Sequence, residues 1–415
     1  MLDASKNSHK PNKWVTSPSK ISPKEIQVNV NDLRQIQTNM VSNTRTGECF
    51  INGNKLAIAI FCVSILSIAA AVSPLVYSLT RRNDEVSTTT TDTSTLFSNA
   101  TSTTSGVIPY RWNTTGITIL NSSQISSVSG LFFDSNDTLY IVDEYPNSVV
   151  WKLPKNTLTP ILVAGIVQSR GTGASQLNRP QDVYVDSNKN MYVTDCYGHR
   201  LQKFINGSTA GVTIAGITGS NGTALNQFNC PRYFCLDPTE TYLYINDNSN
   251  QRTMLYRSNS TTGTNGTIVA GGNSNGNSNI QLHYPWGIHY LPSISTDMYI
   301  ANNAGHSVMR WIPGASSGIF VAGTAGVSGS NATLLNSPMG LKIDAYLNIY
   351  VVDKRNHRVQ MFCQNSSLGI TIVGTGVAGN STTELNAPRS IAFDSSMNMY
   401  IGDTGNVRVQ KFLKI

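Results

Sequence analysis

One short line of sequence recurs along this chain at a nearly constant spacing. The segment "VVDKRNHRVQMF" at 351–362 returns with few changes as "VTDCYGHRLQKF" at 193–204 and "IGDTGNVRVQKF" at 401–412. A wider pattern, Tyr-[Ile/Val]-x-[Asp/Asn], occurs six times and ends at Asp143, Asp195, Asp247, Asn302, Asp353 and Asp403. The steps between these six positions are 52, 52, 55, 51 and 50 residues. This period is typical of a fold built from repeated units.

Each unit contains short β-rich runs. A run such as "PQDVYVD" (180–186) precedes the Tyr pattern, and in the first five units a Gly-ended run such as "VTIAG" follows it. Four short strands in about 50 residues predict a propeller blade. The sixth unit stops at residue 415 after three strands, and "GITIL" at 116–120 resembles the missing fourth. We therefore predict an all-β, six-bladed β-propeller over residues 107–415, closed by an N-terminal strand.

The recurring line resembles the signature of NHL repeats, Asp-x-x-[Asn/Gly]-His-Arg-Val-Gln-x-Phe. Residues 351–362 match it throughout, and residues 195–204 match it at most positions. The sixth unit departs from it at Val407, and the fourth at Asn302 and Ser307. The resemblance covers residues 116–415 and implies a six-bladed NHL-type propeller. Functions vary widely among such proteins, so the function has to be inferred from the site.

An Asp and an Arg stand five residues apart in four units, across the expected turn between the second and third strands. The pairs are Asp195 and Arg200, Asp247 and Arg252, Asp353 and Arg358, and Asp403 and Arg408. The fourth unit lacks both members, which indicates that they share a site, although the first unit keeps Asp143 without an Arg. We predict structural ion pairs at these positions.

The chain upstream of the repeats contains a long apolar segment. Residues 56–79 are 24 consecutive residues without a charge. Because roughly 20 apolar residues cross a bilayer as a helix, this segment predicts a single transmembrane helix. Residues 1–55 are predicted to be a disordered basic cytosolic tail. Residues 80–106 are predicted to be a stalk, since 14 of the 19 residues from 87 to 105 are Ser or Thr.

Eleven Asn-x-Ser/Thr sequons all lie after the predicted membrane helix. The asparagines are Asn99, Asn113, Asn121, Asn136, Asn206, Asn221, Asn259, Asn265, Asn331, Asn365 and Asn380. This asymmetry predicts a type II glycoprotein of the plasma membrane or a secretory-pathway membrane, with its C-terminal domain extracellular or lumenal.

Four cysteines fall in that oxidising compartment. Cys196 lies in the second-to-third-strand turn of unit two, and Cys230 precedes Pro231, where the inter-blade loop leads into unit three. Both should emerge on the same face of adjacent blades, so we predict a Cys196–Cys230 disulfide. Cys235 and Cys363 are expected to remain buried thiols. Only two cysteines precede the propeller, which excludes a RING-type zinc module.

Three histidines, His199, His306 and His357, occupy the same turn position in three units. Three His could bind zinc, and the resemblance extends to peptide-amidating lyases that hold a catalytic zinc inside the ring. These residues belong to the repeat consensus, so we expect a structural role and no cofactor. From residue 107 onward, 20 Lys and Arg stand against 16 Asp and Glu, which indicates no nucleic-acid partner.

Arginines and aromatic residues gather where the loops of one face should emerge. Inter-blade loops and second-to-third-strand turns share that face, and propellers carry function on their loops. We expect ligand-binding residues there: Tyr145, Tyr197, Arg232, Trp286, Arg355 and Arg389. Packing of Trp286 between blades is an equal alternative. The sequence favours recognition of an extracellular protein, peptide or glycan over catalysis. The alternative is a metal-dependent enzyme resembling amidating lyases or lactonases.

Overall fold

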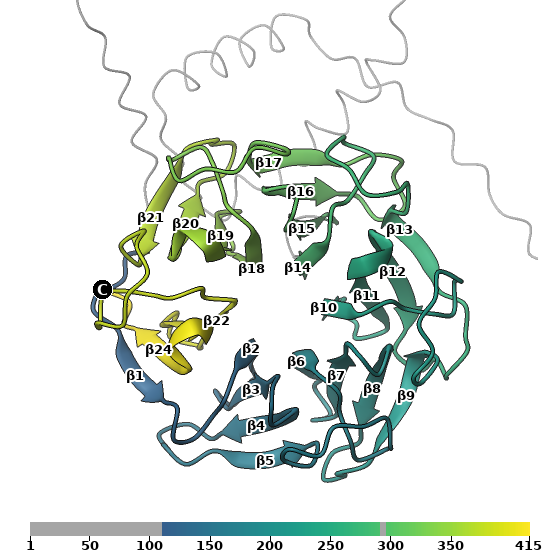
Figure 1. Ribbon diagram of the computed structural model, residues 1–415. Helices are drawn as coiled ribbons and strands as arrows, with labels where there is room; N and C mark the ends of the chain where they lie inside the picture. The colour runs from purple at the N-terminus through teal and green to yellow at the C-terminus, as the bar shows by residue number, and fades with distance from the viewer. Residues whose placement is uncertain (1–109, 291–295) are drawn as a thin grey trace, which may run out of the picture. The chain divides into compact units, whose positions relative to one another are not determined.

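The computed structural model describes residues 110–290 and 296–415, which form a ring of six four-stranded sheets (Figure 1). Within each sheet, neighbouring strands are antiparallel and follow one another from the axis of the ring to its rim. The predicted all-β six-bladed propeller is therefore confirmed.

The first three blades are formed by consecutive strands. Blade 1 contains β2 (Val128–Phe133), β3 (Leu139–Asp143), β4 (Val149–Leu153) and β5 (Ile161–Ala164). Blade 2 contains β6 (Pro180–Val185), β7 (Met191–Asp195), β8 (Arg200–Phe204) and β9 (Gly211–Gly216). Blade 3 contains β10 (Pro231–Leu236), β11 (Tyr242–Asp247), the 3-10 turn η1 (Asn248–Asn250), β12 (Arg252–Arg257) and β13 (Thr267–Gly271).

The other three blades complete the ring. Blade 4 contains β14 (Pro285–Tyr290), β15 (Met298–Asn302), β16 (Ser307–Trp311) and β17 (Ile319–Gly323). Blade 5 contains β18 (Pro338–Ile343), β19 (Ile349–Asp353), η2 (Lys354–Asn356), β20 (Arg358–Phe362) and β21 (Gly369–Val373). Blade 6 contains β22 (Ser390–Phe393), β23 (Met399–Asp403), η3 (Thr404–Asn406), β24 (Arg408–Phe412) and the N-terminal β1 (Ile117–Leu120).

The two ends of the propeller close the ring together. Strand β1 pairs with β24, so the first strand of the domain is the outermost strand of its last blade (Figure 1). Trp112, just upstream, is buried and donates from Nε1 to the Met397 carbonyl at 2.8 Å. The closure predicted from "GITIL" is thus present, and it removes the free sheet edges that an open ring would expose.

The hydrophobic core lies between the blades. Val142 and Val150 of blade 1, for example, pack with Val183 and Val193 of blade 2. Apolar residues dominate the buried inner strands, while an outer strand such as β5 exposes its first two residues, Ile161 and Leu162. The innermost strands of neighbouring blades also approach each other closely. A Cβ atom on Gly287 would overlap the Met339 carbonyl of the next blade, so only a glycine fits there.

The consensus histidines fasten one blade to the next. His199, His306 and His357 all have φ values between 50° and 54° in the second-to-third-strand turn. Their Nδ1 atoms accept backbone N–H groups of the following blade, from Cys230 (3.3 Å), Ser337 (3.1 Å) and Ala387 (3.0 Å). In blade 3, Gln251 Oε1 performs the same task by accepting the Tyr284 N–H at 2.5 Å. The role of these histidines in the fold is therefore to join blades.

Replacing His199 and His306 by Gln, as blade 3 already does at Gln251, should make the stability of the propeller less sensitive to acid. Burial lowers the pKa of both imidazoles below the ordinary value of 6.5. As the pH falls through about 6.5, the unfolded chain takes up protons that the folded protein refuses, so the free energy of unfolding decreases. Melting curves between about pH 7.5 and pH 5 should show a smaller loss for the His199→Gln, His306→Gln variant than for the wild type. An equal loss of melting temperature with pH in the variant and the wild type would show that the two histidines do not cause the sensitivity to acid.

The predicted tail, membrane helix and stalk (1–55, 56–79 and 80–106) lie outside the described residues. Among the residues that are described, no helix is long and apolar enough to cross a membrane.

Candidate functional site

Large polar and aromatic side chains meet around the axis on one face of the ring. We call this the upper face; the innermost strands begin here, and the second-to-third-strand turns lie on it. The side chains come from equivalent positions in several blades. Gln181, Arg232 and Trp286 are the second residues of innermost strands, and Arg389 immediately precedes β22. Glu144 and Lys354 directly follow the second strands of blades 1 and 5. Together they form the mouth cluster: Glu144, Gln181, Arg232, Trp286, Lys354 and Arg389.

Trp286 is the centre of this cluster. The Arg232 guanidinium stacks on its ring, with Cζ 4.0 Å from the centroid, and Arg389 approaches the same ring at 6.0 Å. Arg232 Nη1 also donates to Gln181 Oε1 at 2.6 Å. Trp286 is only 9% exposed and also belongs to the core between blades 3 and 4. The two alternatives for Trp286 therefore both apply, because its ring packs between blades and also lies under the two arginines.

The electrostatics of the cluster show an excess of positive charge. Glu144 forms an ion pair with Arg389. Burial raises the pKa of Glu144, but Arg389, Gln181 and Arg232 outweigh burial and hold that pKa below its usual value. Burial lowers the pKa of Arg232 to about 10. Burial, together with Arg389 and Arg355, lowers the pKa of Lys354 to about 8. One carboxylate therefore faces several cations.

Three buried N–H donors in the cluster lack an acceptor. Within the part of the chain that the structure describes, Arg232 Nε, Arg389 Nε and Trp286 Nε1 are inaccessible to solvent and have no hydrogen-bond partner. Buried donors are nearly always paired in native proteins, and leaving one unpaired costs about 1–3 kcal/mol. Beside an excess of positive charge, an anionic ligand would pair these donors, and the two arginine side chains would have to turn to reach it because the donors are shielded in this structure.

A row of aromatic side chains continues this surface over blades 1 and 2. Tyr145 and Tyr197 are 45% and 46% exposed, and the Arg179 guanidinium lies between them, 5.0 Å and 5.1 Å from their ring centroids. Arg170, in the same β5–β6 loop as Arg179, also approaches the Tyr145 ring, with its Cζ 5.0 Å from the centroid. Of the residues expected to bind a ligand, the structure thus brings Arg232, Trp286 and Arg389 together and puts the two tyrosines beside them. Arg355 is exposed on blade 5, next to Lys354.

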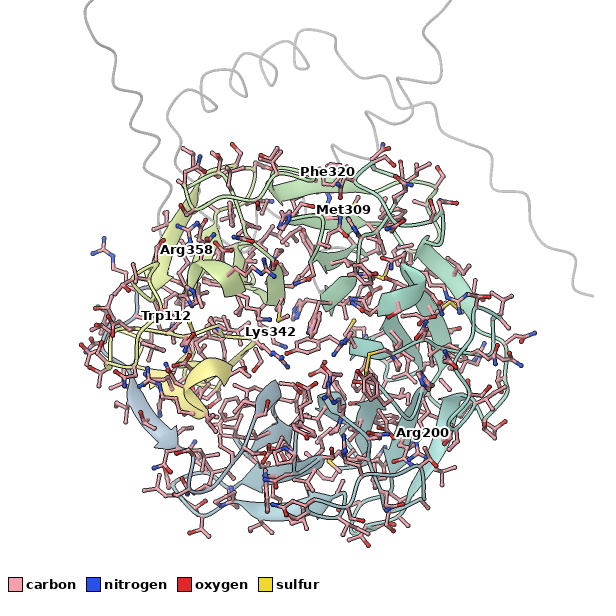
Figure 2. The ribbon with its side chains drawn as sticks, viewed as in Figure 1. Trp112, Arg200, Met309, Phe320, Lys342 and Arg358 are labelled. Atoms are coloured by element: carbon pink, nitrogen blue, oxygen red, sulfur yellow. A yellow bond between two sulfur atoms is a disulfide. The ribbon has the colours of Figure 1, made fainter. Side chains whose placement is uncertain are left out.

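The Asp and Arg of the repeat form buried ion pairs in all four units in which both occur. The Arg Nε to Asp Oδ2 distances are 2.9 Å for Arg200, 2.8 Å for Arg252, 2.9 Å for Arg358 and 2.7 Å for Arg408. Figure 2 shows Arg200 and Arg358 between the axis and the rim of two different blades. Arg200 also donates to the carbonyls of Thr172 (2.8 Å), Gly173 (3.0 Å) and Gln176 (2.9 Å). These pairs therefore hold the inter-blade loops and do not face the mouth cluster.

The two exceptional units show what replaces the pair. In blade 1, Asp143 accepts the Trp151 indole N–H at 3.1 Å and the Asn147 amide at 2.8 Å, so these donors stand in for the missing Arg. In blade 4, Asn302 accepts the His283 N–H at 2.5 Å. Its Nδ2 atom and the Ser307 hydroxyl have no partner among the described residues.

The disulfide predicted between Cys196 and Cys230 is present, with a Cα–Cα distance of 4.0 Å. It joins blade 2 to the loop that leads into blade 3. Cys235 and Cys363 are free thiols, as expected, but both are partly exposed. The prediction that they are buried was wrong, because Cys235 borders a cavity at the axis and Cys363 lies just after the end of β20.

The sequons lie on the surface of the propeller. Asn99 lies outside the described residues, and the other ten asparagines are all exposed. No group of three or more His, Cys, Asp or Glu side chains in residues 110–290 and 296–415 could hold a metal ion.

Sequence reasoning missed half of the mouth cluster. Glu144 and Lys354 directly follow the repeat positions Asp143 and Asp353, and Gln181 follows Pro180 as Arg232 follows Pro231. The signal was therefore positional: in several blades the residue after the repeat Asp or after the strand-initial Pro lies at the mouth. Arg179 lacked such a signal.

Comparisons with known proteins agree with this architecture. The NHL repeat model matches residues 177–204. A Bacteroides thetaiotaomicron protein of unknown function is similar in structure, with a TM-score of 0.55 and 16% identity over 74% of this chain and 73% of that one. An auxiliary nutrient binding protein from the same organism has a TM-score of 0.53 and 17% identity over 70% of each chain. A gluconolactonase from Xanthomonas campestris has a TM-score of 0.52 and 12% identity over 72% and 89%.

Identities this low show a shared fold and nothing about a shared function. Among curated proteins, none matches this sequence.

Proposed function

From the premise that this chain is an NHL-repeat six-bladed propeller, we propose that it is a binding protein whose mouth cluster holds an anionic group of a protein, peptide or glycan. The observation that carries this proposal is the set of three buried, unpartnered N–H donors on Arg232, Arg389 and Trp286. A carboxylate or sulfate oxygen could accept from them.

The charges of the cluster support an anionic ligand. Arg232, Lys354 and Arg389 interact electrostatically with one carboxylate, Glu144, and the neighbouring Arg355 adds a further positive charge. A charge removed from water without a partner is unfavourable, so an incoming anion gains more here than on an open surface. Trp286 and the exposed Tyr145 and Tyr197 add flat aromatic surface, and such residues are common at the energetic centres of interfaces.

The test is binding of acidic probes to the wild-type protein and to Arg232→Met and Arg389→Met variants. Peptides with free C-terminal carboxylates, paired with their amides, and sialylated glycans, paired with desialylated ones, are suitable probes. Each substitution should weaken binding of the anionic member about 10- to 100-fold, since a hydrogen bond to a charged group contributes about 1.5–3 kcal/mol. Arg257→Met is the matched control, because Arg257 is exposed and packs on Tyr242 at the opposite end of blade 3. Equal binding of charged and neutral probes would contradict the proposal.

We further propose that the propeller is the extracellular or lumenal domain of a single-pass type II membrane glycoprotein, anchored by residues 56–79. Ten exposed sequon asparagines and a disulfide support an oxidising, glycosylating compartment. Protease added to intact cells should release the propeller and leave residues 1–55 protected. Labelling of unpermeabilised cells by an antibody to residues 1–50 would show that the orientation is the opposite of the one proposed.

A metal-dependent enzyme is the alternative function. Its specific support is the similarity in fold to a gluconolactonase, which at 12% identity extends only to the fold. Stoichiometric zinc or calcium in the purified protein would favour this alternative over a binding protein.

A further inference from the structure

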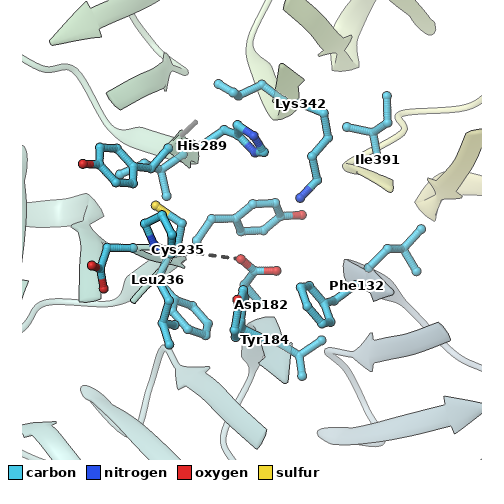
Figure 3. A pocket seen from close by; sticks show the side chains of 17 residues that line it. Phe132, Asp182, Tyr184, Cys235, Leu236, His289, Lys342 and Ile391 are labelled. Atoms are coloured by element: carbon cyan, nitrogen blue, oxygen red, sulfur yellow. Dashed lines mark hydrogen bonds between the residues drawn. The ribbon is translucent and has the colours of Figure 1, made fainter. Parts of the chain in front are cut away.

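The Tyr233 side chain crosses the axis of the ring. Its buried ring projects from β10 of blade 3, and its hydroxyl donates to the Ser129 carbonyl of blade 1 and lies 3.4 Å from the Arg389 carbonyl of blade 6. The mouth cluster lies on the upper side of this side chain. On the lower side the innermost strands enclose a cavity of about 290 Å³ (Figure 3), which we call the lower cavity.

Two opposite charges face this lower cavity without pairing. Asp182 comes from β6 of blade 2 and Lys342 from β18 of blade 5, and both side chains point to the middle of the cavity (Figure 3). The Asp182 carboxylate accepts the Phe234 N–H at 3.3 Å, and no ion pair within 4.0 Å joins it to Lys342. The Lys342 ammonium has no hydrogen-bond partner in the described part of the chain. Each charge therefore lacks a counter-ion at bonding distance.

A third polar group points to the same kind of ligand. His289, from β14 of blade 4, also lines the cavity, and its buried Nε2 has no partner within the described ranges. Burial lowers the pKa of His289 to about 3, so the ring is neutral and can donate one N–H. Burial also raises the pKa of Asp182 to about 7 and lowers that of Lys342, and the attraction between the two charges across the cavity offsets burial only in part.

Much of the rest of the cavity wall is apolar, although Tyr184, Cys235 and Tyr290 also line it. The apolar side chains between the polar groups are Leu131, Phe132, Ile288, Leu341 and Ile391. A second carboxylate, Asp237, borders the cavity but already accepts the Thr241 and Tyr242 N–H groups at 2.8 Å and 2.7 Å. The volume lies at the lower end of the range for small-molecule sites, about 300–1,000 Å³. A ligand for this space must be small, must carry one positive and one negative group, and must present apolar surface to the wall.

We propose that the lower cavity binds a free α-amino acid with an apolar side chain, its ammonium group on Asp182 and its carboxylate on Lys342 and His289. Such a zwitterion supplies both missing counter-charges at once and leaves no charge unpaired. The site is separate from the mouth cluster, since Tyr233 stands between them, and does not depend on an anionic ligand there.

The test is calorimetric titration of the full-length protein in detergent with L-leucine, N-acetyl-L-leucine and L-leucinamide. The two analogues each lack one charge, so each should bind at least about tenfold more weakly than leucine. In an Asp182→Asn variant, leucine and N-acetyl-leucine should bind equally, and in a Lys342→Gln variant leucine and leucinamide should bind equally. Lys203→Gln is the matched control, because Lys203, in β8, lies over the Tyr192 ring of β7 and does not line the cavity.

The analogue comparison uses the wild-type protein, so it stands even if a variant fails to fold. Absence of leucine binding at millimolar concentration would overturn the proposal. So would equal binding of leucine and either blocked analogue to the wild type, because the site would then not recognise both charges.

Discussion

A protein truncated to begin at residue 122 should aggregate, or unfold at a much lower temperature than one that begins at residue 107. The deletion removes β1, which pairs with β24 through Ile117, Thr118 and Leu120, and leaves β24 as a free sheet edge. It also removes Trp112, whose ring lies 5.4 Å from Tyr350 and 5.7 Å from Phe393. Loss of a buried Trp costs about 3–5 kcal/mol and loss of a buried Leu about 2–5 kcal/mol.

Together these losses approach the whole stability of an ordinary domain, about 5–15 kcal/mol. Scanning calorimetry and size-exclusion chromatography of the two truncated proteins measure the effect. The protein that begins at residue 107 is the control for removal of the upstream chain. An unchanged melting temperature for the shorter protein would show that β1 does not close the ring.

Replacing Arg200 by Met should destabilise the propeller by about 3–5 kcal/mol, because it leaves a buried carboxylate without its counter-ion. Asp195 is fully buried and would keep only its contact with the Asn178 N–H at 2.6 Å and other neutral donors. The carbonyls of Thr172, Gly173 and Gln176 would also lose their donor. Urea unfolding measures the loss directly.

Two further variants separate charge burial from packing. Asp195→Asn combined with Arg200→Ser copies blade 4, where Asn302 and Ser307 occupy these places, and should recover part of the lost stability by removing the unpaired charge. Arg310→Met breaks a 3.3 Å pair with Asp297 in which the Arg side chain is 39% exposed, and should cost less than about 1 kcal/mol. Equal losses in the free energy of unfolding for Arg200→Met and Arg310→Met would show that the buried pair contributes no more than the exposed pair.

The repeat made most of the fold predictable from sequence. A nearly constant step, a strand-initial Pro and a Gly-ended strand predicted the number of blades, and the unpaired strand at 116–120 predicted the closure. The same positional logic led to Arg232, Trp286 and Arg389, because residues at equivalent places in different blades meet at the axis. The same reasoning applies to Gln181, which follows Pro180 but was not predicted because a Gln is common at protein surfaces.

The rest depended on distances that a linear sequence does not contain. In blade 1, the Trp151 indole N–H takes the place of the missing Arg as a donor to Asp143. Trp151 lies eight residues after Asp143, whereas the repeat places its Arg five residues after the Asp. Asp182 and Lys342 are 160 residues apart in sequence. Each stands among apolar residues of a strand, where a polar side chain is expected to point to solvent. Only the radial arrangement of the inner strands brings them to one cavity.

The first described residues show on which face of the ring the chain enters the propeller. Tyr110 packs 5.9 Å from Tyr346 in the β18–β19 turn, and Trp112 bonds to Met397 in the β22–β23 turn. These turns lie on the side opposite the mouth cluster. The described chain therefore begins on the lower face of the propeller, and Arg232, Trp286 and Arg389 lie on the face that its first residues leave uncovered.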